Sequence, residues 1–190
     1  ISSQEVSHHL STTTPSAPGP DHITLSDLRL THLPDLTALL NLILLHGDIP
    51  TPWKLLRTTL IPKTNSDLHL ATNWRPITIS SVLCRLFNRI LASRLQSRIK
   101  LSDRQKAFVP VDGCLENVII LDNIIKESRR RKTEVNIVGI DVSKAFDSVS
   151  HHSISRALRR FSIDNSFINL ILKSYSNCVT TISAGTSSCS

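Results

Sequence analysis

The pattern of apolar and polar positions predicts five helices along this chain. From Leu33 to His46 apolar residues recur at helical spacing, with Pro34 in the first turn and Gly47 just past the end. Asp112 is placed to cap another helix, and Ser150 is placed to cap the next. The predicted helices cover 33–46, about 80–100, about 113–131, about 151–161 and 167–175.

Short stretches of different character lie between these helices. Thr58 to Ile61 and Val179 to Ser183 are β-prone and predict two strands. Val135 to Ile140 is almost wholly apolar, as expected of a central strand covered on both faces. Residues 1–20 are rich in Ser, Thr and Pro and predict an extended lead-in, while Asn73 to Pro76 predicts a turn before the second helix.

The second helix carries two pairs of like charge at i,i+4 spacing, Arg85 with Arg89 and Arg94 with Arg98. Such pairs cost about 0.2–0.5 kcal/mol each unless an anion lies nearby. Two interpretations remain open for these arginines: a solvated rim beside a buried apolar face, or contacts to nucleic-acid phosphates. The basic run at the end of the third helix, ESRRRK, suits a helix C-terminus or a nucleic-acid patch equally well.

Composition narrows the function classes only partly. The 190 residues have a net charge of +7, which favours an anionic partner such as nucleic acid. The four cysteines form no CxxC pair, which argues against a zinc site, and Cys84 and Cys114 are expected to be buried thiols.

The chain has no Met and opens on ISSQ, so we expect an internal piece of a longer reading frame. Neither a signal peptide nor a membrane-length apolar run is present, which predicts a nuclear or cytoplasmic protein.

The first candidate for chemistry is Asp141, which ends the apolar run from Val135. An unpaired buried carboxylate costs several kcal/mol, so this side chain needs a cation, strong donors or water. Magnesium takes oxygen ligands and keeps part of its shell for phosphates and water. The alternatives are a carboxylate that caps the following turn, or one that pairs with Lys144.

The residues around Asp141 resemble a known motif. DVSKAFD, Asp141 to Asp147, resembles the first catalytic motif of reverse transcriptases, in the form found in non-LTR retrotransposons and group II introns. Four further segments resemble motifs of the same family in the same order: 17–23 (APGPDHI), 49–63 (IPTPWKLLRTTLIPK), 73–95 (NWRPITISSVLCRLFNRILASRL) and 105–125 (QKAFVPVDGCLENVIILDNII). Within the last, DGCLEN is similar to site-specific non-LTR elements that insert in ribosomal RNA genes.

The resemblance implies an α+β fold. The implied fold is the right-hand polymerase fold, with fingers and a partial palm. Its antiparallel sheet is incomplete, and helices pack against it. It implies fingers over 21–134, after the lead-in of 1–20, and a partial palm over 135–190. It also implies an RNA template, a DNA primer and deoxynucleoside triphosphates as partners, with Mg²⁺ or Mn²⁺ as cofactor and no membrane.

The resemblance also assigns roles to individual residues. In this family nucleotides are added by two-metal phosphoryl transfer. By the match, Asp141 is the first catalytic, metal-holding carboxylate, the carbonyl of Val142 adds a ligand, and Phe146 selects deoxynucleotides by excluding the ribose 2′-OH. Arg75 is expected to bind the triphosphate, with Lys63 as a second contact. For Phe146 an ordinary core aromatic is the alternative.

Two features depart from the family pattern. His22 and Ala107 stand where the family usually has Gly, which restricts the backbone at both positions. The later Gln-Gly motif and the paired aspartates do not occur in the 190 residues. We therefore expect that this polypeptide does not polymerise by itself, because one carboxylate cannot hold two metals.

Three hypotheses follow. The first is a fragment of an RNA-directed DNA polymerase, the reverse transcriptase of a non-LTR retrotransposon. The second is a non-catalytic retrotransposon remnant that at most binds nucleic acid through a basic fingers surface. The third, a group II intron maturase, shares KAFD but fits DGCLEN less well.

Overall fold

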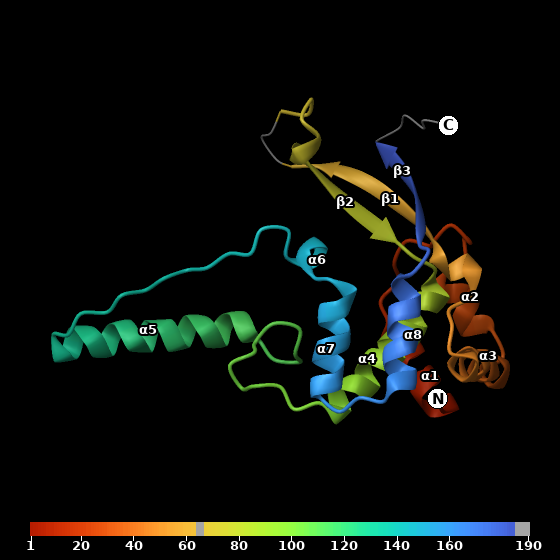
Figure 1. The fold of residues 1–190 in the computed structure, drawn as a ribbon, viewed down its shortest axis with the longest axis horizontal. Coiled ribbons are helices and arrows are strands. Elements are labelled where there is room, and N and C mark those ends of the chain that lie inside the picture. Colours follow the sequence, from red (N-terminus) through yellow and green to blue (C-terminus); the bar gives the residue numbers. More distant parts are fainter. Residues whose placement is uncertain (64–66, 185–190) are drawn as a thin grey trace. The chain divides into compact units, whose positions relative to one another are not determined.

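The computed structural model describes residues 1–63 and 67–184, and they fall into two compact units (Figure 1). One unit consists of Ile1–Ser97 together with the chain from His151 onward, and the other of Arg98–Ser150. No helix in the described residues is long and apolar enough to cross a membrane.

The larger unit is built around helix α4 (Val82–Arg98). Its apolar positions recur at three and four residues, as the sequence predicts, and Phe87 and Ile90 are fully buried. The core also includes side chains from α1 (Ser3–Thr12), α2 (Leu25–Leu30), α3 (Leu33–His46) and α8 (Asn165–Tyr175). Trp53, in the 3₁₀ turn Thr51–Lys54, packs its ring against Phe87 with centroids 5.8 Å apart. Helix α7 (His151–Arg160) buries Ser155 and Leu158 and contacts α8.

The ends of α3 are where the sequence places them. The helix has Pro34 in its first turn and Gly47 at its C-cap, where φ is 70° and the Gly47 N–H donates to the Ile43 carbonyl. A residue with a β-carbon is disfavoured in this left-handed conformation, so Gly suits the position. The predictions for α4, α7 and α8 are confirmed to within two residues or so at each end.

The sheet has three strands in the order β2-β1-β3. Strand β1 (Leu55–Pro62) pairs antiparallel with β2 (Trp74–Ile79) and parallel with β3 (Val179–Ala184). The expected antiparallel sheet is therefore wrong in one ladder: the sheet is mixed. Parallel strands need a long connection, usually with helices, and the chain between β1 and β3 provides one.

A row of threonines joins the three strands on one face of the sheet. The Thr58 hydroxyl lies 2.8 Å from that of Thr78 on β2 and 2.7 Å from that of Thr180 on β3. Thr58 itself is buried, so its hydroxyl finds partners inside the protein rather than in water. This polar row contributes to fixing the register of both ladders.

The expectation of a turn at Asn73 to Pro76 is wrong, because Trp74–Ile79 is a strand. Only Ala71–Asn73 forms a turn of 3₁₀ helix before it. Pro76 has no N–H for a ladder, but β2 lies at the edge of the sheet and pairs on one side only. An edge strand tolerates such a residue.

The N-terminal lead-in is not extended throughout, since Ser3–Thr12 forms helix α1. Ser2 and Glu5 form a capping box, in which the Ser2 hydroxyl accepts from the Glu5 N–H and the Glu5 carboxylate accepts from the Ser2 N–H. Val6 and Leu10 are buried on the inner side of this helix. The Ser/Thr/Pro-rich residues that follow, 13–19, carry no helix or strand.

Backbone contacts fix residues 13–19 to the larger unit. At Gly19 an added β-carbon would lie 2.6 Å from the Ser81 nitrogen, so the chain approaches the start of α4 too closely for a side chain. The next turn closes with the His22 N–H donating to the Gly19 carbonyl at 3.1 Å. His22 has a φ of 57°, whereas Ala107 is not among the residues with positive φ. Of the two departures from Gly, only the one at His22 strains the backbone.

The smaller unit is dominated by helix α5 (Gly113–Arg131). Asp112 is its N-cap, as predicted, and accepts a hydrogen bond from the Leu115 N–H. Six apolar side chains of this helix are exposed within the described residues, Leu115, Val118, Ile119, Ile120, Leu121 and Ile124, whereas Ile125 is half-buried.

The cysteines differ in their surroundings. Cys84 is buried, which raises the pKa of its thiol to about 11, and the Asn88 side chain donates a hydrogen bond to its sulfur. Cys114 is exposed, so the expectation of a buried thiol is wrong there. Cys189 lies outside the described residues.

The charge pair between α1 and α4 generates the first prediction. Arg94 donates two hydrogen bonds to the Glu5 carboxylate, at 2.7 and 2.8 Å. These bonds, with the Ser2 N–H, lower the pKa of Glu5 to about 2 from its usual 4.5. A carboxyl with a lowered pKa stabilises the fold above its unfolded value and loses that effect as pH falls from about 4.5 toward about 2.

The substitution Glu5→Gln keeps a side chain that can complete the capping box and removes the charge. Because the Glu5 and Arg94 side chains are 33% and 42% exposed, we expect a loss of about 1 kcal/mol in unfolding free energy at neutral pH. The loss should shrink as pH falls from 4.5 toward 2 in urea titrations. Glu134→Gln, at an exposed site, is the control. A loss that does not depend on pH contradicts the assignment.

The strained turn generates a second prediction. His22→Gly should raise the unfolding free energy by about 1 kcal/mol, since a left-handed φ costs a residue with a β-carbon roughly that much. Ala107→Gly is the matched control and should not stabilise, because Ala107 lies outside the positive-φ set. Thermal or urea unfolding measures both. Equal stabilisation by the two variants would show that backbone strain is not the cause.

Candidate active site

The segment that leads to Asp141 does not form the predicted strand. Residues 133–142 carry no helix or strand, and Ile137, Val138 and Ile140 are exposed. A central strand needs hydrogen-bonded strands at its edges and packed layers on both faces. No described segment pairs with this one. The prediction for Val135–Ile140 is therefore wrong for the described chain.

Asp141 presents a free carboxylate. The residue is exposed, and among described residues no ion pair or hydrogen bond engages its side chain. The two structural alternatives, a pair with Lys144 and a cap on the following turn, are thus absent from the described chain. The short helix α6 (Ala145–Ser148) has no side-chain cap and begins after Lys144, whose φ is 50°.

The described residues do not by themselves form a metal site. Nowhere in 1–63 and 67–184 do three His, Cys, Asp or Glu side chains gather as a metal centre requires. Asp141 and the Val142 carbonyl are oxygen donors of the kind that Mg²⁺ prefers, but two donors leave most of its octahedral shell unfilled.

Phe146 is not a core aromatic, which was the alternative to its role as a nucleotide gate. It is 80% exposed and meets the ring of Phe108 edge-on, with centroids 6.0 Å apart and planes at 78°. Phe108 is exposed too and has a φ of 60°. Asp147 lies in the first turn of α6 and is exposed.

Arg75 and Lys63 lie on one face of the sheet. Arg75 is opposite Ile61 in the β1–β2 ladder, and Lys63 follows Ile61 by two residues, so the pleat directs both basic side chains to the same face. The Lys63 N–H donates to the Asn73 carbonyl at 2.8 Å, which continues the ladder beyond Pro62. Two cations so placed can bind phosphate oxygens.

The two cationic side chains differ in their hydrogen-bond partners. Arg75 is exposed, and within the described chain its guanidinium has no hydrogen-bond partner. The Lys63 ammonium donates to the Thr72 carbonyl at 2.6 Å and keeps donors for another ligand. Both belong to the larger unit, while Asp141, Val142 and Phe146 belong to the smaller one.

Three of the four arginines predicted to bind nucleic acid have partners inside the protein. Arg85 donates to the Ala17 carbonyl at 2.6 Å, Arg89 to the Thr13 hydroxyl at 2.8 Å, and Arg94 to Glu5. Arg98, at the end of α4, is exposed. The N-terminal segment supplies the acceptors for Arg85, Arg89 and Arg94, so these three side chains need no nucleic-acid phosphate as a partner.

Sequence reasoning missed the acceptors of these arginines and a second set of arginines on α7. Arg156 and Arg160 are exposed at i,i+4 spacing on a helix without an acidic residue. The stretch SRALRR, Ser155 to Arg160, contains the signal, because it places two basic residues one helical turn apart on the side away from the apolar face.

Comparisons with known proteins agree with the motifs. Residues 61–188 match the family described as reverse transcriptase (RNA-dependent DNA polymerase). The chain is 48% identical over 171 residues to a Pol polyprotein from the type-1 retrotransposable element R2 of Popillia japonica, covering 90% of this chain and 24% of that protein.

Two further relatives carry similar names. The chain is 40% identical to the Pol polyprotein of the type-2 element R2DM of Drosophila melanogaster, over 84% of this chain and 15% of that protein. It is 42% identical to an R2 polyprotein of Nasonia vitripennis, over 75% of this chain and 14% of the relative. The chain thus spans a quarter or less of these relatives.

These matches confirm the resemblance to non-LTR retrotransposon enzymes that the ordered motifs indicated, and they do so over the stretch that includes DVSKAFD. The chain belongs to the reverse transcriptase family.

Proposed function

We propose that this chain supplies the nucleotide-binding fingers and the first catalytic carboxylate of an R2-type RNA-directed DNA polymerase. The observation that carries the proposal is the exposed, unpartnered Asp141 within DVSKAFD, in a chain 48% identical to an R2 polyprotein. A free carboxylate can receive a divalent ion, which the reverse transcriptase family uses in general.

In this proposal the basic residues of the sheet and the segment around Asp141 have separate tasks. Arg75, with Lys63 beside it on the sheet, binds the triphosphate of the incoming deoxynucleotide through its planar guanidinium. Asp141 and the Val142 carbonyl would hold part of the shell of Mg²⁺ or Mn²⁺, which would supply positive charge beside the phosphoryl group in transfer. Residues 21–134 then act as fingers and 135–190 as part of the palm, with an RNA template and a DNA primer as partners.

Phe146 fits the role of a gate better than that of a core residue. Its ring is exposed and touches the described protein at the Phe108 ring. An exposed flat ring close to Asp141 in the sequence is available to contact a sugar and to exclude a 2′-OH by shape. The loss of that ring should relax the choice between deoxyribose and ribose.

A second function is favoured by one observation. Arg75 is exposed and within the described chain its guanidinium has no hydrogen-bond partner, so the 190-residue chain alone is proposed to bind nucleic acid through its basic fingers surface, without catalysis. The two proposals apply to different molecules: catalysis to a longer protein of the relatives' length, and binding to this chain.

The carboxylate can be tested in a chimera. The matching segment of the Popillia japonica polyprotein is replaced by this chain, and primer extension on an RNA template is measured with Mg²⁺. Asp141→Asn should lower the rate by about 10³-fold or more, because an amide removes the charge that holds the metal. Asp147→Asn is the matched control within the same motif and should keep most activity. Comparable extension by the unsubstituted and Asp141→Asn chimeras refutes the proposed role.

The gate is tested in the same chimera. Phe146→Ala should raise the ratio of ribonucleotide to deoxynucleotide incorporation, by about tenfold, since removal of one steric contact is worth about 1–3 kcal/mol of discrimination. Phe108→Ala is the control, because it removes the contacting ring and leaves Phe146 in place. If discrimination does not change with Phe146→Ala, the residue does not select the sugar.

A further inference from the structure

The basic residues of α7 stand apart from those of α4. In the part of the chain that the structure describes, no ion pair or hydrogen bond engages the side chains of Arg156, Arg159 or Arg160. The helix His151–Arg160 contains no acidic residue to balance them. Like charges one turn apart repel each other, so a helix that carries them without partners gains from a bound anion.

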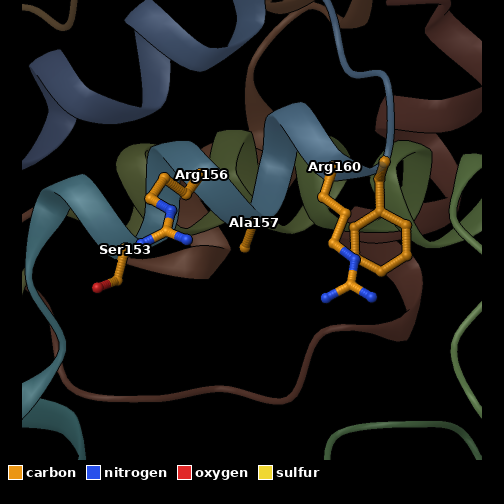
Figure 2. A pocket seen from close by; sticks show the side chains of 5 residues that line it. Ser153, Arg156, Ala157 and Arg160 are labelled. Carbon is orange, nitrogen blue, oxygen red and sulfur yellow. The ribbon is translucent and has the colours of Figure 1, made fainter.

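The arginines lie opposite the packed side of the helix. Ser155 and Leu158 are buried, whereas Arg156 and Arg160 are exposed. Figure 2 shows Ser153, Arg156, Ala157 and Arg160 along one side of α7, with both guanidinium groups directed toward the same open space. Ala157 lies between the two arginines, and its short side chain leaves a depression between their long side chains.

A hollow of about 480 Å³ follows this side of the helix, lined by Ser153, Arg156, Ala157, Arg160 and Phe161. All five residues belong to α7 or follow it directly, so the hollow is a feature of one element. Phe161, 38% exposed, places an aromatic side chain at its end.

We infer that this surface, the α7 hollow, binds the phosphodiester backbone of single-stranded nucleic acid. Four helical residues rise about 6 Å, which lets two guanidinium forks reach neighbouring phosphates of one strand. The Phe161 ring supplies a face on which a base can stack, and charged grooves with aromatic residues are the usual means of single-strand binding.

The occupant follows from this chemistry. A lone phosphate or an acidic peptide could pair with the arginines, but neither the phosphate nor the carboxylates of the peptide would make use of the Phe161 ring. The site lies in neither the proposed metal segment nor the Arg75 face, so it adds a nucleic-acid contact to those that the family match implies.

The inference is tested on the whole 190-residue chain with fluorescent oligo(U) and oligo(dT) of about 12 nucleotides. Binding is measured by anisotropy at several salt concentrations, with a chelator present and nucleotides absent. Arg156→Glu with Arg160→Glu should lower affinity about tenfold or more, and should reduce the salt slope by about 1.4, which corresponds to two phosphate contacts on a single strand. Failure here leaves the test of Asp141 untouched, because no metal is involved.

Lys100→Glu with Arg104→Glu is the matched control, since these exposed residues have the same spacing and the same change in charge. It should change affinity by less than about twofold. Phe161→Leu should lower affinity by about threefold to tenfold and leave the salt slope unchanged, because stacking releases no counterions.

Circular dichroism confirms that each variant is folded before its affinity is interpreted. Loss of binding to either oligonucleotide in the arginine variant supports the inference. An equal loss in the control variant overturns it, as does an unchanged salt slope, binding to duplex alone, or binding of poly-glutamate at equal affinity.

Discussion

Helix α4 is fixed by two kinds of contact, and the larger unit is arranged around both. Its inner face buries Phe87 and Ile90 among residues of α1, α3 and the Trp53 turn. Its outer edge carries Arg85, Arg89 and Arg94, whose donors meet acceptors between Glu5 and Ala17. The apolar contacts place the helix, and the arginines then attach the N-terminal segment to it. Residues 13–17 have few buried side chains, so the hydrogen bonds from these arginines are needed to order them.

This arrangement divides the positive charge of the chain into two classes. Arginines with internal acceptors contribute to the fold, and Arg57 and Arg29 belong with those of α4 because they donate to the carbonyls of Pro18 and Leu10. Arginines without acceptors, such as Arg75 and Arg156, remain available to a ligand. The net charge of +7 therefore does not show where nucleic acid can bind. Most of the arginines of α4 are engaged inside the protein, whereas arginines elsewhere are available.

The sequence predicts the helices well because local signals agree with packing: α3 has Pro34 and Gly47 at its ends, and α5 has Asp112 as its cap. Helix α1 was missed although Ser2 and Glu5 form a capping-box pattern, because the composition of residues 1–20 as a whole outweighed it. The strand at Val135–Ile140 was overpredicted, since propensity says nothing about which partner strand is present. At the candidate site, the motif gives the identity of Asp141 and Phe146, and the exposure of both was not predictable from it. The partners of the α4 arginines could not be predicted at all, because they depend on residues about 70 to 90 positions away.

A contrast between two sets of arginines underlies the proposed nucleic-acid site: Arg85, Arg89 and Arg94 of α4 are bonded inside the protein, and Arg156 and Arg160 of α7 are free for a ligand. Nitrogen-15 spectra of the arginine Nε–H groups, recorded while an oligonucleotide is added, test it residue by residue. The Arg156 and Arg160 signals are expected to shift together, while the Arg94 signal stays at the position set by its bond to Glu5. Shifts at Arg85, Arg89 and Arg94 with none at Arg156 would contradict it.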